Sequence, residues 1–186
     1  MDALTALHTR NSVNLLSEPG PSKAQLDNII KAGLRACDHR SLTPWKFLLI
    51  DGDSRKQFGA LMVKAKEAAD KAPLSTELRT KLEAKPMRAP TILVVVAKIV
   101  DHDKVPELEQ ILSAGAASQM IMTAAHAQGL GAIWRSGSMM FTQEMRQGLG
   151  LADTDKIVGF IYLGTPKVKK PLPALAVNDF LERWPN

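Results

Sequence analysis

Apolar residues in the first third of the chain recur every three to four positions, which is the period of a helix that packs on one side. Residues 2–9 are predicted to form a short helix with Leu4 and Leu7 turned inward. A second helix is expected after Ser22, because Gln25 completes the Ser-x-x-Gln spacing of a capping box. The apolar stripe of this second helix consists of Leu26, Ile29, Ile30, Gly33, Leu34 and Cys37.

The same capping spacing recurs at Ser54 and Gln57, and it predicts a third helix. The polar, basic segment that follows, residues 71–90, contains three prolines. We interpret it as a mobile insertion that carries a helix at about residues 75–84. A further helix is expected over residues 142–149. The apolar face of the third helix consists of Phe58, Leu61, Met62 and Ala65.

Short runs of β-branched and aromatic residues predict four strands, at residues 45–50, 91–97, 132–134 and 157–163. The run at 91–97 is apolar throughout, as in a strand buried on both faces. The Gly-Thr-Pro sequence that begins at Gly164 is expected to stop the last strand. Because long helical segments separate the strands, the predicted fold class is α+β, with a central mixed or antiparallel sheet covered by helices.

The longest predicted helix starts at Pro106, reaches about Gln128 and is stopped by Gly129. Its middle is small or apolar on nearly every face, whereas a surface helix shows a polar side. We therefore expect a central helix that takes part of its cover from a second subunit. The tail, about residues 167–186, is expected to dock on that subunit through Phe180, Leu181 and Trp184.

Composition narrows the class of protein. The 186 residues fit a single domain, and a 45% apolar content agrees with a packed core. The net charge of +5 is dispersed and aromatic residues are only 5%, which disfavours nucleic-acid binding. We interpret the excess positive charge as serving solubility and the attraction of an anionic cofactor. The one cysteine, Cys37, excludes an intrachain disulfide and is expected to pack inside. No Cys/His cluster has zinc spacing, so no metal is expected.

Neither export nor membrane insertion is indicated by the residue pattern. The chain starts with Met1 and Asp2, without the basic and apolar segments of a signal peptide. The most apolar long segment, residues 111–133, is interrupted by polar residues such as Gln119 and His126, so it is a poor membrane span. A cytoplasmic protein is expected.

An anion-binding triplet follows the first predicted helix. Arg10, Asn11 and Ser12 combine a guanidinium, which grips a phosphate through two hydrogen bonds, with a hydroxyl. The alternative is an ordinary solvated helix end, where an arginine also suits the helix dipole.

A second polar corner follows the second helix. Arg35 and His39 are four residues apart and would share one side if the helix persisted to His39, with Asp38 orienting the imidazole. A surface arginine and a helix-terminal histidine are the alternative. Because the turn from Ser41 to Trp45 comes next, we favour a ligand site here. Together with the first triplet, it predicts one phosphorylated cofactor held at both ends.

A third candidate joins the central helix to a strand. Gly129 and Gly131 permit close approach of a planar ligand, and Arg135 and Ser136 are placed to meet its oxygens, although a helix cap and tight turn is the alternative. The full Gly-x-Gly-x-x-Gly fingerprint is absent, which disfavours a Rossmann site. His126 is interpreted as a hydrogen-bonded structural residue. Neither a Gly-x-Ser-x-Gly frame nor a convincing acid pair is found, so no catalytic side chain is predicted.

In their order and spacing these segments resemble a known family. Arg10-Asn11-Ser12 is similar to its opening Arg-Arg-Ser, and residues 36–45 are similar to its Ala-Pro…Pro-Trp turn. Residues 127–137 and 156–166 complete the pattern. The chain resembles the FMN-dependent nitroreductases, and among them the small YdjA-like members, over nearly its whole length.

The resemblance implies a nitroreductase fold and a homodimer with a long interface helix and two FMN molecules at the subunit interface. It implies that Arg10, Asn11 and Ser12 form one edge of the flavin site and that the other subunit supplies Arg35 and His39. It also implies FMN contacts by Trp134, Arg135 and Ser136. The stretch that it associates with the nicotinamide nucleotide consists of Ala124, Ala125, His126, Ala127, Gln128 and Gly129.

Two positions depart from the family pattern. Asn11 replaces a second arginine and removes a positive charge near the expected phosphate, for which Lys167 or Lys169 would compensate. Cys37 stands where proline is usual, which we expect to be harmless.

The implied activity is an NAD(P)H oxidoreductase in which hydride passes to flavin N5 and then to a nitroaromatic or quinone-like acceptor, in a ping-pong cycle. Other flavin chemistry on the same fold remains open: flavin degradation, dehalogenation or oxidation of a biosynthetic intermediate. A flavin-binding protein without turnover and a basic nucleic-acid binder are the alternatives from other classes.

Overall fold

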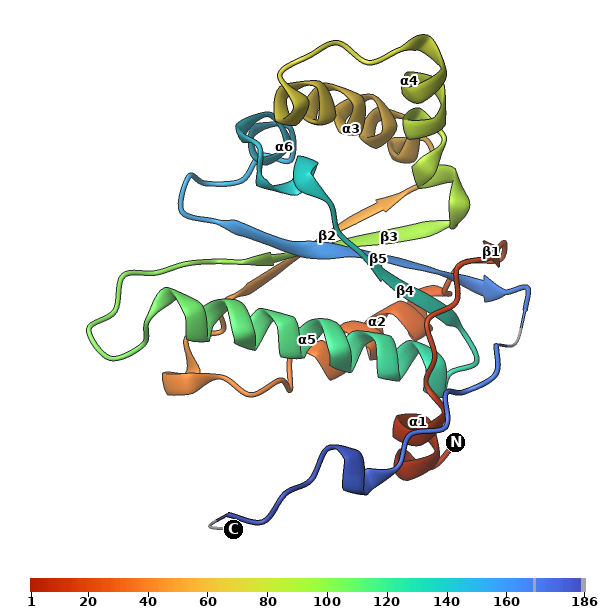
Figure 1. Ribbon diagram of the computed structural model, residues 1–186, viewed down its shortest axis with the longest axis vertical. Helices are drawn as coiled ribbons and strands as arrows, with labels where there is room; N and C mark the ends of the chain where they lie inside the picture. Colours follow the sequence, from red (N-terminus) through yellow and green to blue (C-terminus); the bar gives the residue numbers. More distant parts are fainter. Residues whose placement is uncertain (169, 185–186) are drawn as a thin grey trace.

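In the computed structural model, which describes residues 1–168 and 170–184, one five-stranded sheet forms the centre of the molecule (Figure 1). Its order is β1-β5-β3-β2, and β4 also pairs with β5. Every pairing between these strands is antiparallel, and one isolated parallel bridge joins Ser12 to Ala132 beside β4. The predicted α+β class is confirmed. The strands are β1 (Leu16–Ser17), β2 (Trp45–Asp51), β3 (Thr91–Ala97), β4 (Gly131–Arg135) and β5 (Lys156–Pro166).

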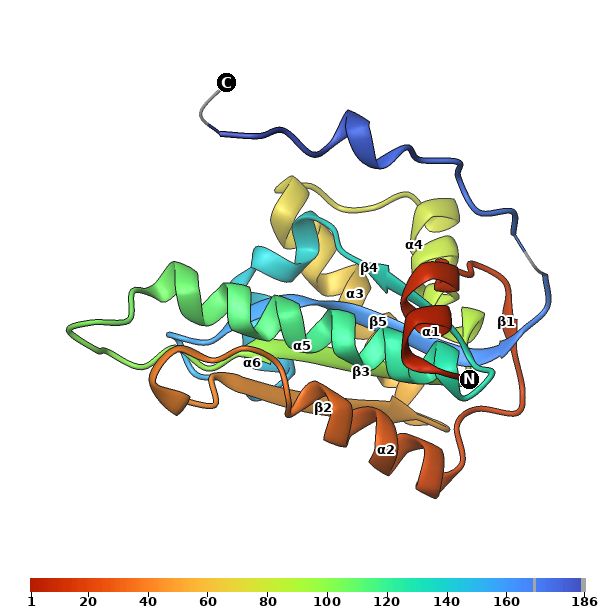
Figure 2. The ribbon, with the colours of Figure 1, turned by 90° about the horizontal axis from the view of Figure 1, so that it is seen from below.

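Helices cover both faces of the sheet. In Figure 1, α3, α4 and α6 lie on one side of it and α2 and α5 on the other, while Figure 2 shows α1 beside the end of α5. The helices are α1 (Ala3–Thr9), α2 (Lys23–Gly33), α3 (Ser54–Asp70), α4 (Thr76–Glu83), α5 (Glu107–Ala127) and α6 (Gln143–Gly148). The described residues also form the short 3-10 turns η1 (His39–Ser41), η2 (Lys85–Arg88), η3 (Ser138–Phe141) and η4 (Val177–Asp179).

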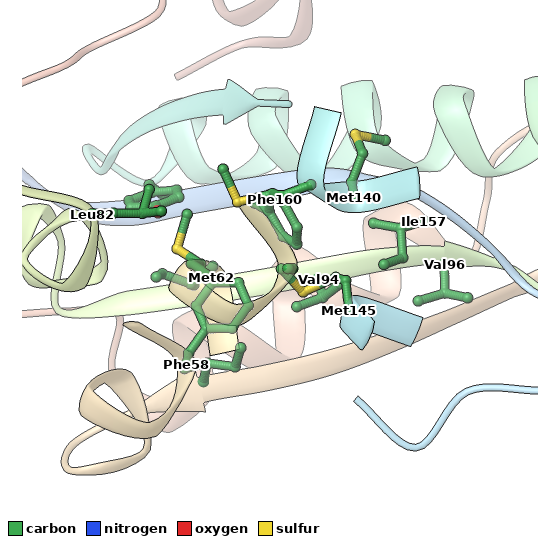
Figure 3. Packing of buried hydrophobic residues seen from close by; sticks show 14 of the residues in the cluster. Phe58, Met62, Leu82, Val94, Val96, Met140, Met145, Ile157 and Phe160 are labelled. Carbon is green, nitrogen blue, oxygen red and sulfur yellow. The ribbon is translucent and has the colours of Figure 1, made fainter. Parts of the chain in front are cut away.

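The strand β3 serves both cores, as its uninterrupted apolar run predicts. All of its residues are buried; Val94 and Val96 pack in the cluster under α3, and the alternate residues Leu93 and Val95 pack in the cluster under α5. Figure 3 shows the first cluster, in which the Phe58 and Phe160 rings meet edge to face with centroids 5.3 Å apart. The sheet is therefore apolar on both sides.

The two predicted capping boxes have different outcomes. Ser22 and Gln25 form a full box at the start of α2, as expected. The box at Ser54 is wrong: Asp53 holds the cap position, and the Ser54 hydroxyl donates to the Asp51 carbonyl 2.5 Å away and accepts from the Asp51 N–H. Ser54 therefore closes the turn between β2 and α3.

Three other expectations, on buried residues and on where a strand ends, are wrong. Leu4 and Leu7 are exposed in this chain, and Ala6 is the buried residue of α1. Because α2 ends at Gly33, Cys37 leaves the helical stripe and is exposed. The strand β5 does not stop at Gly164 but runs to Pro166, since β1 pairs with its last two residues.

Two helices that position the site match the sequence. The helix α4 begins after Ser75, and its Leu82 packs in the core under α3; the mobility of this insertion stays a prediction. The helix α5 begins after Pro106, and Gly129, with φ of +80°, follows its end. Across the described ranges, no helix combines the length and the apolar character that crossing a bilayer requires.

Candidate functional site

The N-terminal triplet lies against the edge of β4. Arg10 caps the C-terminus of α1, Ser12 bridges to Ala132, and the Val13 N–H donates to the Ala132 carbonyl at 2.9 Å. The same strand continues into Trp134 two residues later. The structure thus places Ser12 beside the strand that leads into residues 134–136. The residues that line a cavity together with Arg135 are Asn14, Leu15 and Leu16.

Two of the candidate arginines have a buried guanidinium nitrogen without a hydrogen-bond partner in the described part of the chain. Arg10 Nη1 and Arg135 Nε are buried and have no hydrogen-bond partner within residues 1–168 and 170–184. A buried charged donor without a partner is costly. An anionic ligand would supply the missing acceptors, so the donor set fits a phosphorylated cofactor.

Asn11 has a different role from its neighbours. Its side-chain amide donates to the carbonyls of Lys170 and Pro171, each at 3.3 Å. It therefore anchors the start of the C-terminal tail. Lys167 donates its backbone N–H to the Leu15 carbonyl and lines a cavity with Arg88 and Arg135, whereas Lys169 falls outside the described residues.

The second predicted corner lies at the other end of α5. His39 Nδ1 is 2.6 Å from an oxygen of Glu109, in the first turn of α5, and the Thr9 hydroxyl is 2.9 Å from Nε2 of His126, in its last turn. At ~1.5 Å per residue, Glu109 and His126 are roughly 25 Å apart. Arg10 and His39 of one chain therefore cannot reach the same small ligand.

The local reasoning about His39 is corrected in two ways. The helix α2 ends at Gly33, so Arg35 and His39 do not share a helical face. Asp38 does not orient the imidazole; its carboxylate accepts from the backbone N–H groups of Leu42 and Thr43, at 3.2 and 2.6 Å. The left-handed residues of this loop are Arg40, Ser41 and Thr43, with φ of 65°, 54° and 48°.

The predicted nicotinamide stretch, residues 124–129, forms the end of α5. Its His126 is hydrogen-bonded to Thr9, and the pKa of His126 lies below its usual value because burial and the charge of Arg10 both disfavour the cation. The Gln128 amide donates to the carbonyls of Gln25 and Ala124. These side chains therefore hold α5 to α1 and α2.

Trp134 lies over a glycine of β5. A Cβ atom at Gly159 would come within 2.0 Å of the indole Nε1 of Trp134, so only glycine admits the indole there. The far edge of the indole approaches Gly115 of α5. About a third of Trp134 stays exposed, at 37%, which leaves part of the ring available to a ligand.

The sequence reasoning missed a basic cavity next to Trp134. The cavity has a volume of about 240 Å³, and Lys85 and Arg88 of η2 line it together with Arg135. The Arg135 guanidinium carbon lies 5.4 Å from the centre of the Tyr162 ring. Burial raises the pKa of Tyr162 to about 12, although Arg135 and Arg88 oppose the rise. The sequence feature that could have indicated this cavity is the pair Lys85 and Arg88, which lie three residues apart just before the buried strand β3.

The described residues contain no candidate metal cluster. No group of three or more His, Cys, Asp or Glu side chains in the described part of the chain is arranged to hold a metal ion. The polar and aromatic side chains that line the cavity beside β4 include Lys85, Arg88, Arg135, Ser136, Tyr162 and Trp134. Cationic and aromatic groups of this kind can bind and orient an anionic, planar molecule.

Comparison with known proteins identifies the family. The family model described as "Nitroreductase family" matches residues 8–165. The chain belongs to the nitroreductase family. It is 45% identical over 169 residues to "Putative NAD(P)H nitroreductase YdjA" of Escherichia coli (strain K12), and the match covers 91% of each chain.

Solved structures share the fold of this nitroreductase. A nitroreductase-like family protein from Bacillus cereus superposes with a TM-score of 0.82 at 21% identity, covering 98% of this chain and 96% of the other. A "putative nitroreductase in complex with FMN" from Desulfovibrio desulfuricans has a TM-score of 0.74 at 22% identity, with coverage of 98% and 96%.

Proposed function

We propose that this nitroreductase-family chain is an FMN-dependent NAD(P)H oxidoreductase that reduces nitroaromatic or quinone-like acceptors. The family match and the name of the YdjA relative support the reaction class. The FMN complex of the Desulfovibrio desulfuricans protein supports the cofactor. One observation carries the proposal: Thr9, next to Arg10, contacts one end of α5, and His39 contacts the other end. We infer that the two groups of predicted binding residues are half-sites that complete each other in a dimer.

The residues that would hold FMN come from both half-sites. Arg10 and Arg135 have buried donors without acceptors and would take up negative charge from the cofactor. Ser12, Trp134 and Ser136 lie on the same edge, and Arg35 and His39 would come from the partner. When bound, FMN supplies the hydride chemistry, in two successive half-reactions with NAD(P)H and the acceptor. The cations of the site favour negative charge on any ligand held there.

An exposed apolar face of α5 supports the dimer. Leu108, Leu112 and Met120 recur along one side of this helix and are exposed, with small residues between them. A two-fold axis perpendicular to α5 would bury this face and place each His39 beside the partner's Arg10–Ser12 edge.

The C-terminal tail supports the same assembly. The tail runs away from the body of the chain (Figures 1 and 2), and its Phe180, Leu181 and Trp184 are exposed, Trp184 at 95%. Large apolar side chains on an extended segment need a partner surface. We propose that they dock on the second subunit.

The nicotinamide assignment stays part of the proposal. Within residues 124–129, Gly129 is the exposed residue, and it follows a helix end whose side chains are already bonded within the chain. Any contact with the nucleotide would therefore use the backbone around Gly129.

The absorbance spectrum of the purified protein tests this function. We expect FMN to remain bound through gel filtration, at a mass twice the 20.3 kDa of the chain. Anaerobic NADH or NADPH should bleach the flavin absorbance, and a nitroaromatic or a quinone should restore it. FMN-loaded protein that neither nucleotide bleaches would contradict the proposal. Bleaching without acceptor-dependent NAD(P)H oxidation would point to other flavin chemistry.

A further inference from the structure

The excess positive charge of this chain is carried by one layer of the fold. Residues 54–88, which form α3, α4 and η2, contain nine lysines and arginines and four acids. Their net charge of +5 equals that of the whole chain, so the rest of the chain is neutral overall. Even without Lys85 and Arg88, which also line the cavity beside Trp134, seven cations stand against four acids in this segment.

This charged layer is exposed and lies apart from the proposed dimer contacts. In Figure 1, α3 and α4 are on one side of the sheet, while α5 and the C-terminal tail are on the other. Lys64 and Lys71 are exposed and form no ion pair within the described residues. Lys81 pairs with Glu77, whose charge the net value already includes. The layer therefore presents uncompensated positive charge to solvent.

Exposed apolar side chains accompany these cations. Leu78 of α4 is 54% exposed and Met87 of η2 is 42% exposed. A groove of about 500 Å³ runs between α3 and α4, and its lining includes Leu74, Leu78, Leu82, Lys66, Asp70 and Lys81. Apolar and basic groups thus lie together on a single surface.

A surface of this composition suits an anionic bilayer. Lysines and arginines are attracted to anionic lipid headgroups, and apolar side chains beside them enter the boundary between headgroups and acyl chains. A nucleic acid attracts the cations through its phosphates but gives an exposed leucine no apolar surroundings. Docking of this kind needs no helix that spans the membrane.

We propose that α3, α4 and η2 form a surface that docks on membranes rich in anionic phospholipids, with Leu78 and Met87 entering the lipid interface. The groove between α3 and α4 would face the bilayer, with Lys66 and Lys81 toward the headgroups. This membrane docking is separate from the proposed redox function and is tested without cofactor turnover.

Sedimentation of the purified full-length protein with lipid vesicles tests the surface. One set of vesicles is phosphatidylcholine alone, and the other is equimolar phosphatidylcholine and phosphatidylglycerol. Each lysine or arginine near an anionic surface strengthens binding by about fivefold, so an excess of three charges predicts a preference of about a hundredfold for the anionic vesicles. High salt should weaken this binding, because it screens exposed charges. Equal binding to both vesicles, or none to the anionic ones, would overturn the proposal.

Charge removal then locates the surface. The double variant Lys64→Gln/Lys81→Gln alters two exposed side chains and should bind anionic vesicles about twentyfold more weakly. The matched control Lys23→Gln/Lys31→Gln removes the same charge from exposed lysines of α2, on the opposite side of the sheet, and should bind like the wild type. Equal losses in the two variants would show that only the overall charge matters, which contradicts a docking surface on α3 and α4.

Removal of one apolar side chain separates a bilayer from other anionic partners. Leu78→Gln should weaken binding to anionic vesicles by about tenfold, because a leucine is lost from the lipid interface. Leu4→Gln on α1, at a leucine 64% exposed, is the matched control and should leave binding unchanged. Full binding by Leu78→Gln would overturn the proposed insertion. Retention of the protein by DNA or polyglutamate, with no binding to anionic vesicles, would assign the charge to another class of partner and overturn the proposal.

Discussion

His126 links the N-terminal triplet to the end of α5. Its Nε2 pairs with the Thr9 hydroxyl, and Arg10 is the charged group that, after burial, disfavours its protonation. The folded-state pKa therefore lies below the usual 6.5, so the unfolded chain binds more protons between the two values. The contribution of His126 to stability is complete above about pH 6.5 and declines as the pH falls toward the folded-state pKa.

The pKa of His126 should report on the charge of Arg10. Addition of FMN is expected to raise this pKa, because a phosphate beside Arg10 offsets the repulsion. NMR titration of the His126 Cε1 proton with and without FMN measures the change. In Arg10→Gln the pKa should already be higher without FMN and should respond less to it. An unchanged pKa on FMN binding would place the phosphate away from Arg10.

At Gly159, the absence of a Cβ atom leaves room for the Trp134 indole. We expect Gly159→Ala to displace the Trp134 indole, since its Cβ would lie 2.0 Å from Nε1, and to lower the free energy of unfolding by about 1–3 kcal/mol. Denaturant unfolding and tryptophan fluorescence measure these effects. In a Trp134→Leu background the same substitution should cost much less. A similar cost in both backgrounds would show that the strain lies elsewhere.

At the scale of elements, α5 both separates the half-sites and offers the proposed interface. Its buried side packs on the sheet through residues such as Ala117 and Ile121, and its other side exposes Leu112. Small residues keep the helix close to its neighbours, while the leucines leave an apolar face. The helix α5 thus keeps Arg10 and His39 of one chain apart. Its exposed apolar face is also the proposed interface through which His39 of a second chain would come close to Arg10.

Leu112→Glu should therefore abolish FMN retention without unfolding the chain. Leu112 is 62% exposed, so the change costs little inside the subunit, but a charge in an apolar interface is unfavourable. Light scattering coupled to gel filtration should show a monomer without yellow colour. Leu78→Glu on α4, at a leucine 54% exposed, is the matched control and should remain dimeric and yellow. A yellow monomer would exclude the shared site.

For the whole molecule, the proposed dimer contains two sites, each built from both chains. One chain gives Arg10, Ser12 and residues 134–136 to one site, and its Arg35 and His39 to the other. A heterodimer of two variants, each altered in a different half-site, would therefore contain one doubly altered site and one intact site. Combining two such variants tests whether each site is shared between chains.

Mixing two defective variants should restore function. Arg10→Ala and His39→Ala homodimers are each expected to bind FMN weakly, because every site lacks one contact. After joint unfolding and refolding, a heterodimer carries one doubly altered site and one intact site. Mixed samples should regain up to a quarter of the wild-type tight sites if chains pair at random, as measured by FMN titration. No recovery would mean that both residues act within the same chain.

The sequence by itself determined features that depend on near neighbours. The unbroken apolar run of β3, the Ser22–Gln25 cap and the stop at Gly129 are all readable, because a strand period, a cap and a left-handed residue involve a few adjacent positions. Arg10 and Ser12 were likewise identifiable as anion-binding residue types.

Only the tertiary structure decided which of these residues meet. Cys37 is exposed because α2 ends early, and Glu109, seventy residues away in the sequence, is the partner of His39 in place of Asp38. Lys85 and Arg88 line the same cavity as Arg135 only because η2 and β4 converge beside β5. Hydrophobic period and capping are local, whereas convergence of charges depends on the path of the whole chain, and for the proposed flavin site on a second copy of it.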